Sequence, residues 1–220
     1  MTSGEQSEIA FLGKITASVT HELNNVLAIV EQSAGLLDDM IAGEERGFPL
    51  SVDRLKAVST SVQKQTQRGL EMVARLNRFA HTTDGSHLVF DANEVVNNLV
   101  DLCRRFALHK RLDLEFRSAA AAIKMEGNPF VLQQTLFIAL QAAFAGAADG
   151  STIVIENRTD SKNVEICVNY PGSVGPDRDR MAMIDALARQ MNGTTVFNTG
   201  DGRMLIRLRF SLSTPHVEAE

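Results

Sequence analysis

Two long stretches with a helical spacing of apolar residues open the chain. From about Glu8 to Met40 the apolar residues recur every three or four positions, which predicts a helix of about nine turns. The segment AGEERGFP, residues 42–49, ends this pattern with two glycines and a proline. A second apolar pattern follows Ser51, an N-cap residue type, and runs to about His81. Two long helices with a short connection pack antiparallel, so a helical hairpin is predicted.

The apolar positions also predict which faces of the two helices are buried. On the first helix the stripe consists of Leu12, Val19, Val26 and Met40, with Leu23, Val30 and Leu37 beside it. On the second helix it consists of Leu55, Val58, Val62, Met72, Val73, Leu76 and Phe79. One hairpin cannot cover both stripes, so two chains are expected to pair as a homodimeric four-helix bundle. Residues 63–69, QKQTQRG, interrupt the second stripe with polar side chains for which the sequence offers no reason.

After residues 82–90 the pattern changes to short helices that alternate with strands. Helices are predicted at about 93–107, 129–148 and 180–191, the last with Gly193 as its C-terminal cap. Strands are predicted at about 112–116, 152–157, 164–168, 194–198 and 204–211, the last two joined by the turn TGDG. The fold class is therefore α+β, a long helical hairpin followed by an α/β sandwich with one sheet under one helix layer. The predicted domains are a hairpin at 1–82, a linker at 83–90, the sandwich at 91–213 and a tail at 214–220.

Composition excludes several classes of function. The 220 residues are 44% hydrophobic and 22% charged, as in ordinary globular proteins. A net charge of -5 gives no reason to expect nucleic acid or an anionic membrane as a partner. The first residues, MTSGEQSE, have no signal-peptide pattern and no apolar run of membrane-spanning length is evident, so a cytoplasmic location is expected. Neither the two cysteines nor the scattered histidines His81, His87, His109 and His216 have metal-ligand spacing.

One histidine stands apart, in the segment VTHELNNVLAIV of the first helix. At about 100° per residue His21 falls opposite the apolar stripe, and Asn25, one turn later, falls beside it. Glu22 falls between this outer face and the buried stripe. Small or flexible residues around the imidazole are candidate contacts for a partner protein: Lys14, Ser18 and Ala28. A solvated surface histidine without function is the alternative.

HELNN on the first helix of such a hairpin resembles the H-box of sensor histidine kinases. LNRFAH at the end of the second helix looks like that family too, and FDANEVVNNLVDLCRRFA, GNPFVLQQTLF and VEICVNYPGSVG are similar in order to its ATP-binding domain. The resemblance covers about residues 11–212. It implies that His21 is phosphorylated and exchanges the phosphoryl group with an aspartate of a response-regulator receiver domain. It implies that Glu22 is a base or orienting group, and that Asn25 matches a position that orients water when receivers are dephosphorylated.

The nucleotide motifs of that family are not conserved in this chain. The asparagine that ligates Mg²⁺ in the family matches Ala142, and an earlier asparagine of the same helix matches Ile138. A methyl group cannot ligate a cation that requires oxygen. The Asp-x-Gly-x-Gly turn of the family appears as Asn169-Tyr170-Pro171-Gly172-Ser173, and the following lid segment is short, with Gly175 as its glycine. Asn169 retains the ability to bond an adenine edge, but the other changes each remove a different contact with ATP.

A phosphohistidine motif without a nucleotide site looks like the dimeric histidine phosphotransferases with a degenerate kinase fold, of the ChpT and sporulation-phosphorelay types. The expected function is to carry a phosphoryl group on His21 between receiver aspartates, with no cofactor and with Mg²⁺ on the receiver partner. HELNN is closer to the box of true kinases, which leaves alternatives open. These are a pseudokinase that acts as a response-regulator phosphatase through Asn25, a histidine kinase with an unusual ATP site, and a noncatalytic dimeric scaffold.

Overall fold

The computed structural model describes residues 3–160, 162–172 and 174–212. Ser173, His216 and the predicted tail 214–220 lie outside this part. The chain forms two compact units. The hairpin unit is Gly13–Asn77, and the sheet unit joins the start of the first helix, up to Leu12, to the described residues from Arg78 onward.

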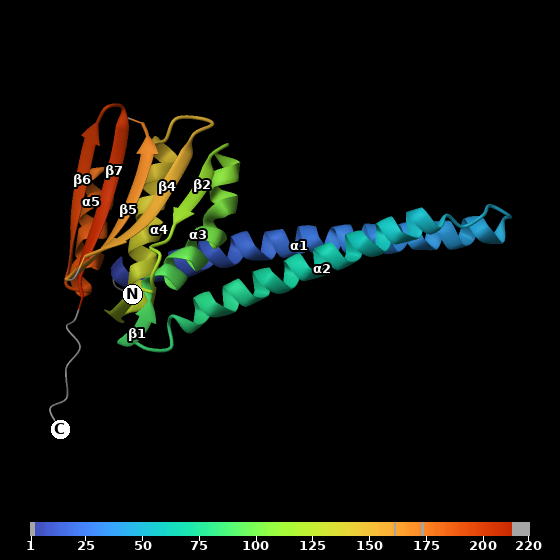
Figure 1. The fold of residues 1–220 in the computed structure, drawn as a ribbon, viewed down its shortest axis with the longest axis horizontal. Coiled ribbons are helices and arrows are strands. Elements are labelled where there is room, and N and C mark those ends of the chain that lie inside the picture. The colour runs from blue at the N-terminus through green and yellow to red at the C-terminus, as the bar shows by residue number, and fades with distance from the viewer. Residues whose placement is uncertain (1–2, 161, 173, 213–220) are drawn as a thin grey trace, which may run out of the picture. The chain divides into compact units, whose positions relative to one another are not determined.

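The two predicted long helices are present as α1, Ser3–Glu45, and α2, Val52–His81 (Figure 1). Helix α2 begins where the sequence indicated, because the Ser51 hydroxyl accepts a hydrogen bond from the Arg54 backbone N–H at 3.4 Å. Helix α1 ends in a Schellman turn: the Phe48 N–H bonds the Gly43 carbonyl at 3.0 Å, and Gly47 has a φ of 89°. A residue with a Cβ is strained at that φ, which explains the glycine.

The buried stripe of the hairpin unit follows most of the predicted positions. Val19, Val26, Val58 and Met72 are buried, as predicted. Val73 is 52% exposed, so its predicted inward position is wrong. It follows Met72 directly, and about 100° of helical rotation carries it out of the interior. Other large apolar side chains of this unit are also exposed: Leu27, Leu36, Ile41, Phe48, Leu50, Val52 and Leu70.

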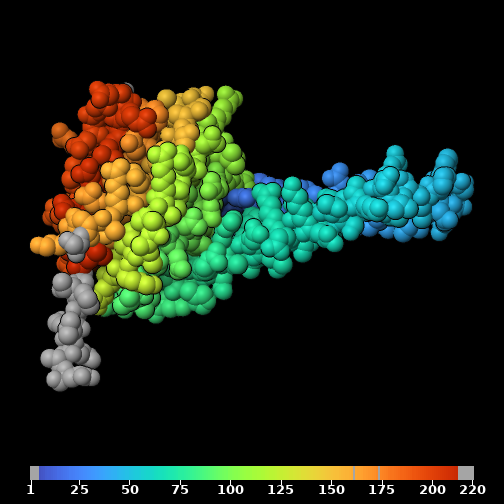
Figure 2. All heavy atoms as spheres, in the orientation of Figure 1, coloured from blue at the N-terminus to red at the C-terminus, as the bar shows by residue number. Residues whose placement is uncertain are grey.

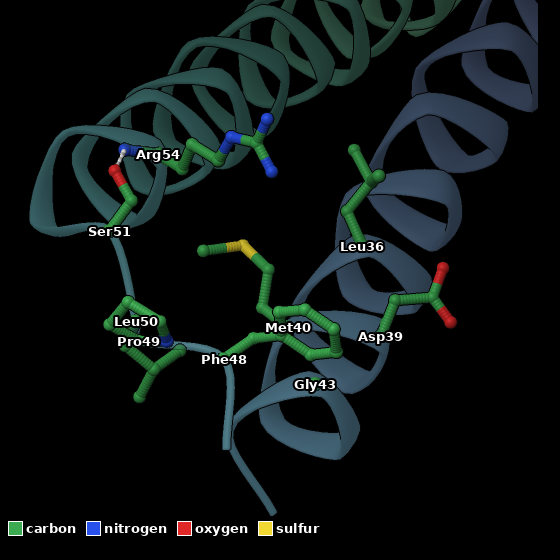
Figure 3. Close-up of a pocket in the computed structure, with 9 residues that line it drawn as sticks. All are labelled: Leu36, Asp39, Met40, Gly43, Phe48, Pro49, Leu50, Ser51 and Arg54. Atoms are coloured by element: carbon green, nitrogen blue, oxygen red, sulfur yellow. Dashed lines mark hydrogen bonds between the residues drawn. The ribbon is translucent and has the colours of Figure 1, made fainter. Parts of the chain in front are cut away.

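Some of these exposed side chains gather where α1 turns into α2. They line a hollow of about 260 Å³ in which the Met40 side chain lies between the two helices (Figure 3). Its lining residues are Leu36, Asp39, Met40, Gly43, Phe48, Pro49, Leu50, Ser51 and Arg54. At 1.5 Å per residue, Met40 lies about 28 Å along α1 from His21, so the hollow is not part of the histidine's surroundings.

The sheet unit contains the following elements after α2: β1 Leu88–Asp91, α3 Ala92–His109, β2 Asp113–Arg117, β3 Lys124–Gly127, α4 Pro129–Gly146, β4 Thr152–Thr159, β5 Asn163–Pro171, α5 Arg178–Gln190, β6 Gly193–Gly200 and β7 Arg203–Ser211. A five-stranded sheet with the strand order β2-β4-β5-β7-β6 is its centre (Figure 1). β2 and β4 are parallel and the other neighbouring pairs are antiparallel. Helices α3, α4 and α5 cover one face, and a small antiparallel sheet of β1 and β3, which the sequence did not predict, adjoins them (Figure 1). The predicted α+β fold is confirmed.

The two faces of the large sheet differ in chemistry. Side chains alternate along each strand, and those toward the helices form the core. On the other face, the open face, ion pairs run along the strands, for example Arg117 with Glu115 at 2.8 Å and Arg158 with Glu156 at 2.7 Å. Figure 2 shows the atoms of these strands at the surface. The fully covered core side chains include Ile153, Ile155, Val164, Ile166, Val168, Tyr170, Ile206 and Leu208.

Helix α4 lies at the middle of this core. Its 18 residues, with a mean hydropathy of 1.2, are apolar enough to cross a membrane by length and composition alone. However, 83% of that stretch is buried inside the protein, as expected for a helix that neighbouring elements surround on all sides.

The last hairpin forms as predicted, with one correction at its start. Asp201 and Gly202 both have positive φ, at 50° and 69°, and form the two-residue turn between β6 and β7. Gly193 is the first residue of β6 and not a helix cap, so that prediction is wrong. Its missing side chain leaves room for the Phe210 ring, with which a Cβ at this position would collide.

Candidate functional site

His21 lies on the exposed side of α1, as predicted from the helical pattern. Asn25, one turn later, is also exposed, and its amide nitrogen lies 3.4 Å from Nδ1 of His21. Nδ1 is the ring nitrogen nearer the backbone, so the amide faces the inner nitrogen and Nε2 is the outer one. The sequence placed these two side chains together, and the structure brings them into contact.

Glu22 is turned from this exposed side toward the second helix. Its carboxylate accepts a hydrogen bond from the Arg68 guanidinium, with 3.2 Å between Nη2 and Oε2. The Glu22 side chain is 26% exposed and that of Arg68 is 54% exposed. The predicted position of Glu22 between the outer face and the buried stripe is therefore confirmed, and its partner was not predicted.

The pair forms where the two helices approach each other closely. A Cβ added at Gly69 would lie 3.4 Å from the Val26 side chain, an ordinary contact distance, so the two helices touch directly beside the pair. Gly69 directly follows Arg68 in the chain. The contact at Gly69 therefore places the Arg68 guanidinium beside the part of α1 that carries Glu22. The polar segment 63–69 thus supplies the partner of the residue next to His21. This segment lies opposite the H-box. Arg68 could have been identified from that position if the register of the two helices had been known.

The three predicted partner contacts have different outcomes. Lys14 and Ala28 are exposed, as expected for the outer face. Ser18 is only 7% exposed, so its expected position on that face is wrong. It lies three residues after buried Ile15 and four before Glu22, on the side of the helix that faces inward. The Ser18 hydroxyl has no hydrogen-bond partner within the described residues.

In the sheet unit, the positions that the family resemblance assigns to metal ligands lie inside the protein. Ile138 is 6% exposed and Ala142 is 2% exposed. Gln134, one turn before Ile138, donates from Nε2 to the Ser7 hydroxyl of α1 at 3.3 Å. The Phe11 ring packs against those of Phe130 and Phe137, with centroids 5.5 and 4.8 Å away. The first turns of α1 therefore cover α4 beside these positions.

The segment after β5 is closed in a similar way. Tyr170 is fully buried, its hydroxyl donates to the Val174 carbonyl at 3.1 Å, and burial raises the pKa of the phenol to about 12. The Val174 carbonyl lies so close to Gly146, at the end of α4, that any side chain there would collide with it. At Ile138 and Ala142 the chain therefore presents buried apolar side chains, which do not fit a Mg²⁺ ion that requires oxygen ligands.

Asn169, the residue considered for an adenine contact, has a different environment. Its side-chain oxygen accepts a hydrogen bond from Nε of Arg203 at 3.0 Å. Tyr170, the next residue of β5, points into the core, so Asn169 points to the open face. The side chain is therefore turned away from α4.

The remaining histidine and cysteine side chains described here contact nearby carboxylates or are buried. His81 lies 2.6 Å from Asp84, and His87 lies 2.8 Å from Glu126. Within the described residues no group of three or more histidine, cysteine or carboxylate side chains is placed to hold a metal ion. Both cysteines are buried, and burial raises the pKa of the Cys103 thiol far above its usual value.

Comparison with solved structures identifies the fold. The chain is similar to the histidine kinase AdeS of Acinetobacter baumannii, with a TM-score of 0.52, 14% identity, and coverage of 88% of this chain and 98% of that chain. It is similar to a histidine kinase of Burkholderia phymatum, with a TM-score of 0.53, 14% identity, and coverage of 97% and 100%. A third similar structure is the histidine kinase ThkA in complex with the response regulator TrrA, with a TM-score of 0.52, 14% identity, and coverage of 94% of this chain and 64% of that chain.

No family model and no curated protein matches the sequence. At 14% identity the similarity shows the fold alone: the chain has a histidine-kinase-like core, a helical hairpin followed by an ATPase-like α/β domain.

Proposed function

We propose that this protein is a phosphorelay histidine phosphotransferase, which carries a phosphoryl group on His21 between receiver aspartates without binding ATP. The observation that carries the proposal is the contrast between the two units. The hairpin unit presents an exposed His21 beside Asn25 and a charge-paired Glu22, whereas the metal-ligand positions of the sheet unit, Ile138 and Ala142, are apolar and buried.

The chemistry of the hairpin site suits a partner that brings its own catalytic groups. A neutral imidazole is a competent nucleophile near neutral pH, and the exposed ring can be approached by another protein. A receiver supplies the aspartate and the Mg²⁺ that neutralises charge on the phosphoryl group, so the histidine protein contributes mainly position. The similar ThkA structure is that of a histidine kinase in complex with a response regulator, which supports a receiver as the partner here.

The partner copy in this proposal is a second chain that pairs through the hairpin. Leu27 on α1 is 62% exposed and Leu70 on α2 is 61% exposed. Contact between such large apolar side chains and water is unfavourable for a hairpin that stands alone. Pairing as a four-helix bundle would cover such side chains. We place the dimer in the cytoplasm, where receivers and their kinases exchange phosphoryl groups, with no nucleic acid or membrane as partner.

Phosphotransfer from a labelled receiver tests the proposal. Purified receivers charged with acetyl phosphate are mixed with the protein, and the label on the protein is followed over time. We expect label on the wild type, and none on His21→Gln, which keeps a polar side chain of similar length. A parallel incubation with labelled ATP and Mg²⁺ is expected to give no label. Transfer from no cognate receiver contradicts the proposal, and label from ATP would show an active kinase instead.

Receiver dephosphorylation is the second candidate function, favoured by the exposed amide of Asn25. Such an amide can hold a water molecule for attack on the receiver's aspartyl phosphate without acting as a nucleophile itself. If this is the function, receiver phosphate is lost faster with the protein present, Asn25→Ala abolishes the effect and His21→Ala retains it. If phosphotransfer is the function, His21→Ala removes the effect of the protein on the receiver. If the protein is a noncatalytic scaffold, neither the wild type nor either variant should change the rate at which the receiver loses its phosphate.

A further inference from the structure

We propose that the outer edge of β6 binds an extended acidic segment of a partner protein, which adds to the large sheet as one further strand. β6 is the last strand in the order β2-β4-β5-β7-β6, so within the described residues it pairs with β7 alone (Figure 1). A strand at the edge of a sheet presents unpaired backbone N–H and C=O groups, to which a peptide can add by β-augmentation. This inference does not depend on the proposed function.

The register of the β6–β7 hairpin identifies the backbone groups that face outward. Gly200 and Arg203 close the two-residue turn, in which the first and fourth residues are hydrogen-bonded to each other. Hydrogen-bonded pairs then alternate along the antiparallel ladder. The N–H and C=O groups of Thr195, Phe197 and Thr199 therefore point away from β7. An added strand requires donors and acceptors at every second position, and these three residues supply them.

β6 lacks the features by which proteins protect the edge of a sheet. Its sequence, GTTVFNTG, contains no charged residue and no proline, and its register with β7 runs without a bulge. Val196 adds apolar surface at this edge, with 40% of the residue exposed. The opposite edge strand, β2, is protected, because it has only five residues and Asp113, Glu115 and Arg117 are charged. The contrast indicates that β6 is open to a strand from a partner.

The charges beside β6 favour an acidic partner. Arg203, Arg207 and Arg209 lie at alternate positions of β7, all on the open face. Within the described residues, the carboxylates near them are those of Glu165, 3.8 Å from Nε of Arg207 and from Nε of Arg209, and Asp160, 3.7 Å from Nη2 of Arg209. These distances exceed those of hydrogen bonds. Three arginines thus share two loosely placed carboxylates, which leaves an excess of positive charge.

An added strand would place its side chains within reach of these arginines. In the register of the hairpin, Arg207 lies opposite Val196 and Arg209 opposite Thr194, so short side chains separate the guanidinium groups from the outer edge. Alternate residues of an added strand project onto the same open face, where carboxylates can form charge-assisted hydrogen bonds with arginine. A second copy of β6 has no charged residue with which to do so. The occupant that fits is therefore an acidic segment of another protein.

Binding of four fluorescent peptides to the full-length protein tests the proposal. Each peptide has eight residues, the length of β6. Three carry glutamate, glutamine or lysine at every second position, between threonine and valine residues, and the fourth is the glutamate peptide with a central proline. Fluorescence anisotropy measures the Kd of each peptide. Hydrogen exchange of the backbone amides, with and without peptide, locates the contact on the protein.

Two pairs of variants separate the backbone contact from the charge contact. Thr199→Pro removes one outward N–H, and an edge strand tolerates proline where its N–H faces solvent. Thr199→Val is the matched control, since it keeps the N–H. Arg209→Gln removes a positive charge beside β6, and its control is Arg117→Gln on the opposite edge of the same face. Thermal unfolding shows that each variant is folded.

We expect the glutamate peptide to bind and to slow amide exchange at Thr195, Phe197 and Thr199. The lysine peptide, the proline peptide and the Thr199→Pro variant should each give binding at least about tenfold weaker, because each removes a hydrogen bond or opposes the charge of the edge. Arg209→Gln should raise the Kd of the glutamate peptide about threefold, the scale of an exposed ion pair. Thr199→Val and Arg117→Gln should match the wild type.

Three results overturn the inference: no slowed exchange on β6 with the glutamate peptide, equal Kd values for the glutamate and lysine peptides, or an unchanged Kd in Thr199→Pro. Light scattering of the protein without peptide tests the other occupant. An oligomer that Thr199→Pro dissociates and Thr199→Val retains would show that a second copy pairs with β6, which also overturns the inference. None of these measurements involves His21 or a receiver, so their outcome and that of the phosphotransfer assay are distinguishable.

Discussion

The ring of Phe11 stands edge-on to the ring of Phe79, with centroids 5.3 Å apart and planes at 88°. Phe11 lies near the start of α1 and Phe79 near the end of α2, and both side chains are almost completely buried. Phe130 and Phe137 of α4 complete this aromatic cluster. The start of α1 is therefore part of the core of the sheet unit, and it covers α4 beside the positions that bind a nucleotide's metal ion in the family.

Replacing Phe11 should destabilise the sheet unit strongly. Phe11→Ala leaves a cavity among three aromatic rings, and a buried phenylalanine-to-alanine change costs about 3–5 kcal/mol. Urea unfolding of the full chain measures the loss. Ile9→Ala is the matched control, since Ile9 is 57% exposed on the same stretch of helix and its loss should change stability by less than about 0.5 kcal/mol. Equal effects of the two substitutions would show that the start of α1 does not belong to this core.

Restoring the amide at the metal-ligand position should not restore nucleotide binding. Ala142→Asn places a polar group where the side chain is 2% exposed, and an unsatisfied buried amide costs about 1–3 kcal/mol. We expect a lower Tm for this variant, and no rise in Tm for variant or wild type when Mg²⁺ and ATP are added. A thermal shift with ATP in the wild type would show that the site holds a nucleotide after all.

Periodicity predicted the exposed position of His21 and its neighbour Asn25, because a helix repeats every 3.6 residues and both positions follow from one stripe. The predicted apolar stripe was displaced around the helix axis by about one residue position. This displacement was enough to place Ser18, which is buried, on the outer face. Local patterns also predicted the turn at Asp201 and Gly202. They could not predict β1 and β3, which are four residues each and depend on pairing with each other.

Arg68 shows the limit of sequence reading most clearly. It lies 46 residues from Glu22, and only the register of the hairpin brings the two together. The covering of α4 by Ser7 and Phe11 depends in the same way on tertiary packing. The resemblance to the kinase family implied the loss of metal ligands at Ile138 and Ala142, but not the contacts of Ser7 and Phe11 with α4.

The size of the side chain at position 69 should control both the stability of the protein and the rate of phosphoryl transfer to His21. Gly69→Ala adds a methyl group at ordinary contact distance, 3.4 Å from Val26, and removes a poor helix former, so stability should rise by up to about 1 kcal/mol. Gly69→Leu cannot fit without separating the helices, so it should lower both Tm and the rate of transfer to His21. Gly35→Leu is the control, since a side chain at Gly35 meets open space. If Gly69→Leu is as stable and active as the wild type, the close approach at this level is not required.

The buried Tyr170 phenol should make the free energy of unfolding fall as the pH rises into the alkaline range. Burial raises its pKa from 10.0 to about 12, so the folded state keeps the proton that the unfolded chain loses near pH 10. The stabilisation is complete below pH 10 and is lost as pH rises toward about 12. Tyr170→Phe should lose about 1 kcal/mol at pH 7 with the hydrogen bond to Val174, and should show a shallower decline above pH 10. The buried Cys103 thiol adds a decline that begins nearer pH 9 and persists in the variant. Parallel curves for the two proteins would contradict the assignment.

The exposed leucines of the hairpin should decide whether the chain is a dimer. Gly69 lies against Val26, so Leu27 and Leu70, the next residues, occur at neighbouring levels of the hairpin, and both are more than half exposed. If a second hairpin covers them, light scattering gives about twice the 24.0 kDa of the chain. Leu27→Glu and Leu70→Glu then place a charge in the interface and should yield the monomer. Leu108→Glu is the matched control, because Leu108 is 68% exposed on α3 and lies outside the hairpin. A monomeric wild type, or a dimer that tolerates a glutamate at both hairpin positions but not at Leu108, would show that the chains do not pair through this surface.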